Sequence, residues 1–297
     1  MVDIESASNF MRTHARLLDR RRFELLFSDG SATAALAALS GYRNQDGGFG
    51  AGLEPDLRSG TSQPGGALHA FEVFEEVGPE TIPMAVELCD WLDSVSLAGG
   101  GLPFAFAIPD PAASATFWVE ADPAAPSLFI SSAVCGAAHR VAEHDPAVAG
   151  HRWLDTATDY CLEQIASLQE APFAIAFRFV LQFLDAIHGK RDEAADELAR
   201  LDQWLPESGI LPVVGGAEGE RLTPLDISPR PNRPLRPLLS PQAVAADLDR
   251  VAAGQSDDGG WEVDFNAFSP AAALEWRGYR TVWALSVLRA NGRLEDD

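Results

Sequence analysis

A single charged side chain interrupts the most apolar stretch of the chain. Residues 173–187 are apolar nearly throughout, and Arg178 stands among them. A helix that is apolar on most of its faces is buried, and a buried guanidinium needs an anionic partner. That partner is either a protein carboxylate or an anionic group of a ligand, and the sequence leaves both alternatives open. We therefore take Arg178 as a candidate ligand-binding residue.

Three further cationic side chains raise the same question. His69 lies in the apolar run 67–74, and Arg277 and Arg280 lie beside the similar run 281–288. If these runs are helices that face a common cavity, the three side chains would meet either protein carboxylates or an anionic ligand group. We include them among the candidate ligand-binding residues.

Aromatic side chains accompany these cations in two places. Phe117 and Trp118 lie in the Pro/Ala-rich segment 102–127, which is long for a connection and therefore typical of a lid or rim. Trp276 and Tyr279 lie at the start of the last helical run. Aromatic faces can pack an apolar chain or stabilise a carbocation. The alternative is that these rings simply fill the centre of the fold.

Loop carboxylates form the third group of candidates. Asp56, Glu120 and Asp122, together with Glu54 and Asp110, lie in loops that would rim a central cavity. Glycosidases use a pair of carboxylates for acid and base chemistry, so we take Asp56, Glu120 and Asp122 as candidate catalytic residues. The alternative is that they are solvated acids, because the chain contains 44 Asp and Glu residues.

The three cysteines indicate buried structural positions rather than a metal site. Cys89, Cys135 and Cys161 each stand in an apolar helical run, and no two are spaced as Cys-x-x-Cys. Asp159 and Cys161 form an Asp-x-Cys string, but a zinc site also needs a converging histidine. The candidates for that role are His139, His144, His151 and His188. We expect reduced cysteines and no cofactor, neither Mg²⁺ nor Zn²⁺.

Two glycine turns organise the helices that must position these side chains. The string Asp-Gly-Gly-aromatic occurs at 46–49 and again at 258–261. We expect Gly47 and Gly259 to adopt positive φ, and the aspartate of each string to bond the backbone two residues on. Each turn follows one helical run and precedes another. Similar units near both ends of a chain are typical of a helical repeat protein.

Helical periodicity and start signals predict about ten helices and no strand. Between them lie the long loops 102–127 and 206–241, the second of which is rich in proline. The helices expected nearest the centre are 62–77, 131–143, 173–187 and 275–290. The full set of predicted helices is 6–27, 31–42, 62–77, 79–95, 131–144, 150–168, 173–187, 190–204, 240–254 and 270–291.

The second glycine turn carries a family resemblance. Gln255, Gly259 and Trp261 match the Gln-x-x-x-Gly-x-Trp core of the QW repeat. That repeat occurs in squalene–hopene and oxidosqualene cyclases and, in a related form, in the β subunits of protein prenyltransferases. The first turn resembles it less closely, with Arg43 and Phe49 where glutamine and tryptophan are usual.

The resemblance implies a fold more than a chemistry. It implies that residues 1–297 form a single all-α domain, an (α/α) toroid of helical-hairpin repeats with QW-like units near 43–50 and 255–261. The Asp-x-Asp-Asp string of cyclases that begin by protonation is absent here. So is the Asp-Asp-x-x-Asp string with which other cyclases hold Mg²⁺ on a diphosphate.

Composition limits the partners. The formal net charge is −22, so the surface repels nucleic acid and anionic membranes on average. Residues 1–22 contain no continuous apolar segment, and no stretch approaches the roughly 18 apolar residues of a membrane span. We therefore expect a cytoplasmic protein with no membrane span and no nucleic-acid partner.

Together these features favour a terpene cyclase- or prenyltransferase-like protein that binds or acts on an isoprenoid, such as an isoprenoid diphosphate, in a central aromatic cavity. Its partner would be a small hydrophobic ligand with an anionic head. Two alternatives stay open. One is a non-catalytic (α/α) toroid that binds a hydrophobic ligand or a protein, and the other is a carbohydrate-active (α/α) barrel that uses loop carboxylates.

Overall fold

Helices account for most of the chain, so the predicted all-α class is confirmed. The computed structural model describes residues 2–294. That part of the chain contains fourteen α-helices: α1 (Ile4–Thr13), α2 (Leu17–Phe27), α3 (Ala32–Leu39), α4 (Pro64–Val77), α5 (Pro83–Val95), α6 (Thr116–Val119), α7 (Leu128–Val141), α8 (Pro146–Ala149), α9 (Arg152–Ala166), α10 (Ala174–Ile187), α11 (Asp192–Leu201), α12 (Pro224–Ile227), α13 (Pro241–Ala253) and α14 (Pro270–Ala290).

Local sequence signals explain where many of these helices begin. The side chains of Asp3, Ser31, Ser240 and Ser269 each accept a backbone N–H from the first turn of α1, α3, α13 and α14. Such caps satisfy N–H groups that have no partner within the helix. Proline opens α4, α5, α13 and α14, at the position where its missing N–H is tolerated.

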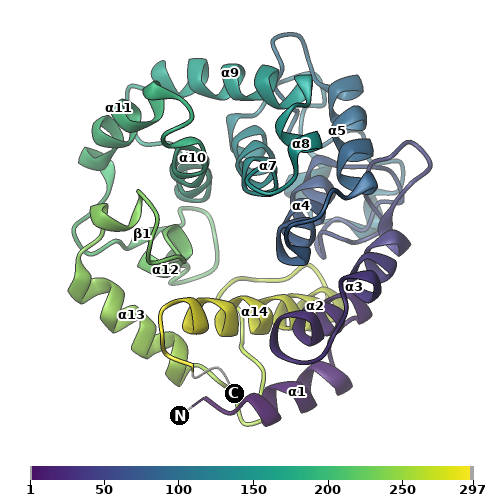
Figure 1. Ribbon diagram of the computed structural model, residues 1–297, viewed down its shortest axis with the longest axis vertical. Coiled ribbons are helices and arrows are strands. Elements are labelled where there is room, and N and C mark those ends of the chain that lie inside the picture. Colours follow the sequence, from purple (N-terminus) through teal and green to yellow (C-terminus); the bar gives the residue numbers. More distant parts are fainter. Residues whose placement is uncertain (1, 295–297) are drawn as a thin grey trace.

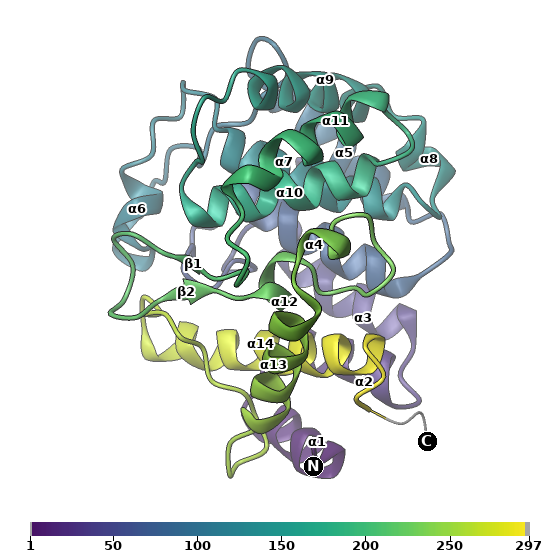
Figure 2. The same ribbon diagram turned by 90° about the vertical axis from the view of Figure 1, so that its left-hand side faces the viewer.

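The helices alternate between the outside and the middle of the molecule. Figure 1 shows α1, α3, α5, α9, α11 and α13 around the outside, and α2, α4, α7, α10, α12 and α14 closer to the middle. The segments expected nearest the centre correspond to α4, α7, α10 and α14. In the side view, α6 lies on one side of the molecule and α8 on the opposite side (Figure 2). Within residues 2–294, no helix has both the length and the apolar character needed to cross a membrane.

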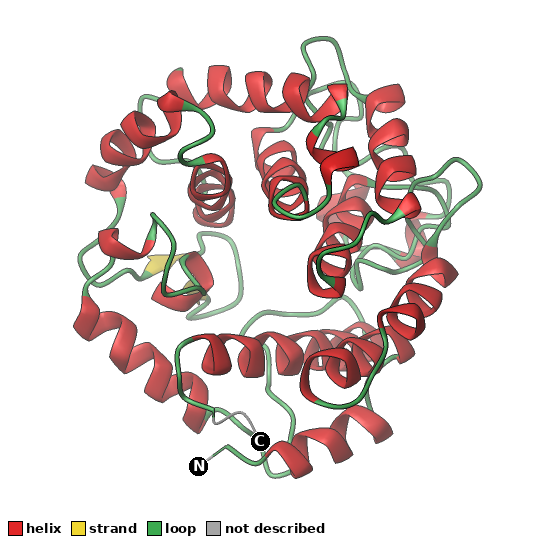
Figure 3. Cartoon of the chain, in the orientation of Figure 1, coloured by secondary structure: helices red, strands yellow, loops and turns green. Residues whose placement is uncertain are grey.

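The proline-rich segment 206–241 contains more regular structure than the sequence predicts. It includes the antiparallel strands β1 (Leu211–Pro212) and β2 (Arg221–Leu222), which Figure 3 shows in yellow, as well as α12. The prediction of no strand was therefore wrong. A ladder only two residues long is too short to show the alternating pattern by which a strand is recognised in sequence.

The predicted helix 6–27 is instead two helices, α1 and α2, separated at residues 14–16. Arg16 has an extended backbone, with φ −61° and ψ 156°. From there its guanidinium donates to the carbonyl oxygens of Gly52 and Leu53, at 3.0 and 2.9 Å. Contacts with a distant loop thus accompany the break in an otherwise helical sequence, and tertiary context overrides local propensity here.

Both glycine turns have the predicted geometry. The φ angle is +92° at Gly47 and +93° at Gly259, and the aspartate of each string accepts the N–H two residues on. At the second turn, a Cβ on Gly259 would lie 2.1 Å from the carbonyl oxygen of Ser6. The side chain of Gln255 also bonds both the N–H and the carbonyl of Asp3. The QW-like turn therefore joins the last helical unit to the first helix.

Candidate functional site

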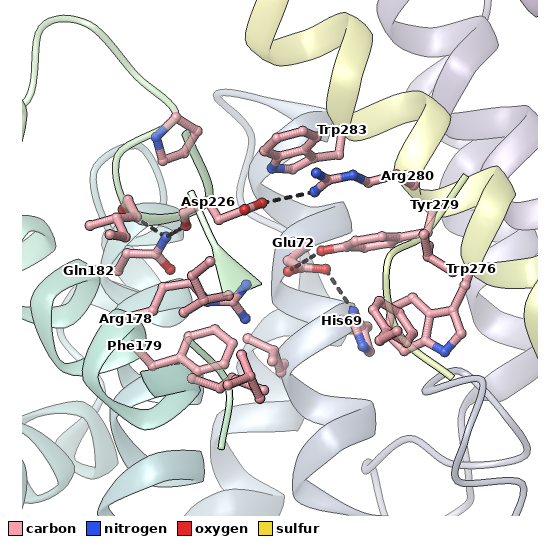
Figure 4. A pocket seen from close by; sticks show the side chains of 18 of the residues that line it. His69, Glu72, Arg178, Phe179, Gln182, Asp226, Trp276, Tyr279, Arg280 and Trp283 are labelled. Carbon is pink, nitrogen blue, oxygen red and sulfur yellow. Dashed lines mark hydrogen bonds and ion pairs between the residues drawn. The ribbon is translucent and has the colours of Figure 1, made fainter. Parts of the chain in front are cut away.

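The inner helices surround a cavity of about 1250 Å³. Side chains from α2, α4, α6, α7, α10, α12 and α14 line it, together with residues of the segments 54–56, 213–222, 228–235 and 263–266 and with Phe104, Ser127 and Phe173. Its volume exceeds the roughly 300–1,000 Å³ that is usual for small-molecule sites. Figure 4 shows the side chains at its centre.

One side of the cavity, which we call the α4/α14 wall, is a chain of bonded polar side chains: Glu54, His69, Glu72 and Tyr279. His69 and Glu72 stand three residues apart on α4 and so share a face. The His69 ring lies 2.8 Å from Glu72 through Nδ1 and 2.9 Å from Glu54 through Nε2. The Tyr279 hydroxyl donates to the second oxygen of Glu72 at 2.9 Å (Figure 4). Because both ring nitrogens face carboxylates, both carry protons.

The carboxylates keep His69 charged. Burial by itself lowers the pKa of His69, but the charge of Glu72 and the hydrogen bonds to Glu54 and Glu72 outweigh burial and raise this pKa to about 9. Burial raises the pKa of Glu72, but the charge and hydrogen bond of His69, helped by Arg22 and Tyr279, lower it to about 2. His69 is therefore an imidazolium at neutral pH and has no free nitrogen with which to accept a proton.

Asp56 lines the cavity where the loop 54–56 meets the segment 263–269, which precedes α14. Its two carboxyl oxygens accept the N–H of Phe268 at 2.7 Å and the indole N–H of Trp276 at 2.9 Å. Burial raises the pKa of Asp56, the two hydrogen bonds oppose the rise, and the carboxylates of Glu54 and Glu275 add to it. The net rise makes Asp56 easier to protonate than an exposed aspartate.

Across the cavity lies the α10 wall, which we define by Arg178 and Phe179. The Nε of Arg178 is buried without a hydrogen-bond partner, and no ion pair joins its guanidinium to any residue of the described chain. The guanidinium lies over the Phe179 ring, 4.2 Å from its centroid. Burial lowers the pKa of Arg178, and the charge of Asp226 opposes this. Figure 4 shows the guanidinium directed into the cavity, toward Glu72.

Arg280 on α14 also faces the cavity but is paired with the protein. Its guanidinium donates to Asp226 at 2.9 Å and lies over the ring of Trp283, 3.7 Å from the centroid. Asp226 is itself held by the hydroxyl of Thr223, in a capping box at the start of α12. The charge of Arg280 is thus neutralised without a ligand.

Stacked rings lead from the α10 wall to the edge of the cavity. Phe179 stacks on Phe129 at 5.5 Å between centroids, and Phe129 contacts Phe104 at 5.1 Å. Phe104 stacks on Trp118 at 4.3 Å, and Trp118 contacts Phe117 at 5.5 Å. Phe117 is 56% exposed, so it marks an opening. These five rings, the aromatic series, offer continuous apolar surface beside Arg178.

Two arginines of the proline-rich segment, Arg230 and Arg233, lie with Arg140 of α7 where α4, α7 and α10 end. Arg140 and Arg230 both bind Glu75, near the end of α4. Arg233 binds Asp185, near the end of α10. Cations are favoured at helix C-termini, where the macrodipole is negative. These arginines serve the protein's own carboxylates and helix ends.

The structure does not bring three of the predicted site residues to the cavity. Glu120 and Asp122 are exposed outside it, because the segment turns Trp118 inward and leaves the acids that follow in solvent. Arg277 binds Asp258 and Glu262. It lies next to Trp276 on α14, and successive residues of a helix point about 100° apart. The predicted residues that do line the cavity are Asp56, His69, Phe117, Trp118, Arg178, Trp276, Tyr279 and Arg280.

The cysteines are buried free thiols. In the Asp-x-Cys string, Cys161 is buried, whereas Asp159 is exposed and pairs with Arg191 at 2.8 Å. Among residues 2–294, no three His, Cys, Asp or Glu side chains are grouped as metal ligands.

Sequence reasoning overlooks many charged residues of the cavity, among them Glu72, Asp226 and Arg22. Glu72 carries a usable signal, because it stands three residues after His69 on one helix face. Asp226 carries a weaker one, the Thr-Pro-Leu-Asp string of a capping box. Arg22 carries no such signal. It lies on α2 and forms two hydrogen bonds of 2.7 Å with Glu76 of α4, and only the fold brings these two residues together.

Comparisons with known proteins assign no family. No family model matches the sequence. No curated protein matches it either.

Proposed function

We propose that the central cavity binds a small molecule that joins an apolar body to an anionic group. The observation that carries this proposal is Arg178, a guanidinium with no anionic partner among the described residues, in a cavity large enough for a ligand. Arg178 is partly buried, so water solvates its unpaired charge only in part. A ligand anion would pair that charge, and the aromatic series would pack the apolar body.

The proposal extends to the family resemblance. The chain would be a terpene cyclase- or prenyltransferase-like (α/α) toroid, and the apolar body of its ligand an isoprenoid. The QW-like turn at 255–261, the alternation of outer and inner helices, and the cavity at their centre support it (Figure 1). Neither Mg²⁺ nor Zn²⁺ is part of this proposal.

A second candidate function is catalysis on the bound molecule, and Asp56 favours it. Asp56 lines the cavity and has a raised pKa, which suits a general acid. Asp56→Asn should abolish turnover and preserve binding, as checked by mass spectrometry of a ligand incubated with each protein. The carbohydrate alternative is less favoured, because Glu120 and Asp122 lie outside the cavity.

Ligand-induced stabilisation tests the proposal. The panel contains anionic isoprenoids, neutral isoprenoids and oligosaccharides, each measured by thermal shift. At a hundredfold excess over its dissociation constant, a bound ligand should stabilise the protein by about 2.7 kcal/mol. Arg178→Met should remove the shift. The matched control is Arg277→Met, which removes an arginine paired outside the cavity and should keep the shift. A shift that survives Arg178→Met, or no shift with any isoprenoid, would contradict the proposal.

A further inference from the structure

We infer that the anionic group accepted by this cavity is a single carboxylate. The ligand lies with that carboxylate on Arg178 and with its apolar end toward Phe117. This inference rests on the proposed function and adds to it the class of head group and the orientation of the ligand.

The first step is the pairing of charges on each side of Arg178. Arg22 forms two bonds with Glu76, and Arg280 binds Asp226. Each of these arginines is therefore neutralised by a carboxylate of the protein. Arg22 also donates to Asp19 at 3.2 Å, so its donors are taken up by the protein. Neither arginine needs a ligand anion to balance its charge.

The second step is the His69 cluster. His69 is shared between Glu54 and Glu72, so the cluster carries one negative charge in excess. That excess faces Arg178 across the cavity (Figure 4). A ligand with one charge finds one unpaired guanidinium. The further negative charges of a diphosphate would instead lie near carboxylates, with Glu72 on one side and Asp226 on the other. Like charges repel most strongly where burial lowers the dielectric constant.

Five other cations on the lining surface do not change this balance. Arg140 and Arg230 bind Glu75, and Arg233 binds Asp185. Arg221 is exposed on β2, so water already solvates its charge. Arg289 lies in the last turn of α14 and donates to the carbonyl oxygen of Leu26.

The geometry of Arg178 suits a planar acceptor. The guanidinium carbon of Arg178 lies over the Phe179 ring, 4.2 Å from its centroid. A guanidinium directs its N–H groups outward in its own plane. A carboxylate can accept two parallel N–H bonds from such an edge, which is the arrangement that arginine forms best. One arginine therefore suffices to hold one carboxylate.

The aromatic series determines the orientation. It begins at Phe179, beneath Arg178, and ends at Phe117, which is 56% exposed. In the opposite direction, toward the ends of α4 and α10, the lining is formed by paired charges such as Arg233 and Asp185. An apolar body loses less by lying along rings than along ion pairs.

The test compares four ligands with one apolar body: farnesoic acid, farnesol, farnesyl phosphate and farnesyl diphosphate. Titration calorimetry should give farnesoate a dissociation constant roughly tenfold or more below those of farnesol and the diphosphate, equivalent to a free-energy difference of about 1.4 kcal/mol. Arg178→Gln should weaken the binding of farnesoate until its dissociation constant equals that of farnesol. The dissociation constant of farnesol should not change. Arg277→Gln should leave both values unchanged, and circular dichroism checks that each variant is folded.

A farnesoate that carries a photoreactive diazirine at its apolar end tests the orientation. It should label the peptide that contains Phe117 and Trp118. Labelling of the peptide around Arg233 would overturn the orientation. Tightest binding of the diphosphate, or a preference for carboxylate that survives Arg178→Gln, would overturn the choice of head group and leave the proposed function standing. Binding of none of the four ligands would overturn both.

Discussion

The charged side chains of the two cavity walls differ in their pairing, because those of one wall are paired within the described chain and that of the other is not. On the α4/α14 wall, His69 touches two carboxylates, and one of them also accepts the hydroxyl of Tyr279. On the α10 wall, Arg178 has an aromatic ring beneath it and no carboxylate bonded to it in the described chain.

Under the proposed function, this difference separates charges that stabilise the fold from a charge that binds the ligand. Removing one member of a satisfied buried network leaves its partners unpaired, so such a network stabilises the fold that contains it. An unpaired charge adds no ion-pair contribution to the stability of the fold until a ligand anion binds it. The two walls should therefore respond differently to mutation, to pH and to ligand.

The largest effect should come from breaking the paired wall. His69→Leu leaves Glu54 and Glu72 buried without the cation between them, and we expect a loss of roughly 3–5 kcal/mol in the free energy of unfolding. Urea denaturation near neutral pH measures it. His69→Gln is the control, because an amide can still donate to one carboxylate and should cost less. A His69→Leu variant as stable as the wild type would show that this network does not hold the wall together.

The pH dependence of stability should identify the same wall. The pKa of His69 is raised from 6.5 to about 9, so the stability that its charge contributes is fully present below pH 6.5 and is lost as pH rises through 9. That shift corresponds to roughly 3 kcal/mol. The pKa of Glu72 is lowered from 4.5 to about 2, so its contribution is present above pH 4.5 and is lost as pH falls through 2.

Unfolding free energies of the wild type and His69→Leu, measured at about pH 6 and about pH 9, isolate the histidine contribution. The difference in free energy of unfolding between the two proteins should be smaller at about pH 9 than at about pH 6. An equal difference at both values would mean that His69 is not the titrating group.

A change outside both walls tests whether lost stability alone removes the ligand response. Gly259→Val places a Cβ against the carbonyl of Ser6 at a φ of +93°, and should cost roughly 1–3 kcal/mol. Gly47→Val is the matched variant. Its added Cβ would lie 2.9 Å from the nearest backbone atom, compared with 2.1 Å at Gly259, so the loss in the free energy of unfolding should be smaller. Denaturant midpoints measure both. Ligand-induced stabilisation should persist in each, and unchanged midpoints for both would refute the need for positive φ.

The smallest effect on stability should come from the α10 wall. Arg178→Met removes a guanidinium that no described carboxylate binds, so the free energy of unfolding should change by less than about 1 kcal/mol. Arg280→Met is the control, and should destabilise more because it leaves Asp226 buried without its ion pair. A large loss of stability in Arg178→Met without ligand would mean that Arg178 is structural, and the contrast between the walls would disappear.

Local features of this protein could be read from its sequence. The positive φ of Gly47 and Gly259 follows from the Asp-Gly-Gly strings, since a turn is a contact between neighbours in the chain. The helices α4, α7, α10 and α14 follow from apolar periodicity and start signals for the same reason. The placing of Arg178 in an apolar helix was also visible, because burial follows from the residues around it in the chain.

Pairings between distant segments were decided by the tertiary structure alone. The sequence raises the same question of an anionic partner for Arg178, Arg277 and Arg280. In the described part of the fold, Arg178 is unpaired, Arg277 binds Asp258 outside the cavity, and Arg280 binds Asp226 inside it. Each outcome depends on which carboxylate the fold carries to within about 3 Å, the length of a hydrogen bond. Helical periodicity says which face a residue occupies, but not which residue from another part of the chain will meet it.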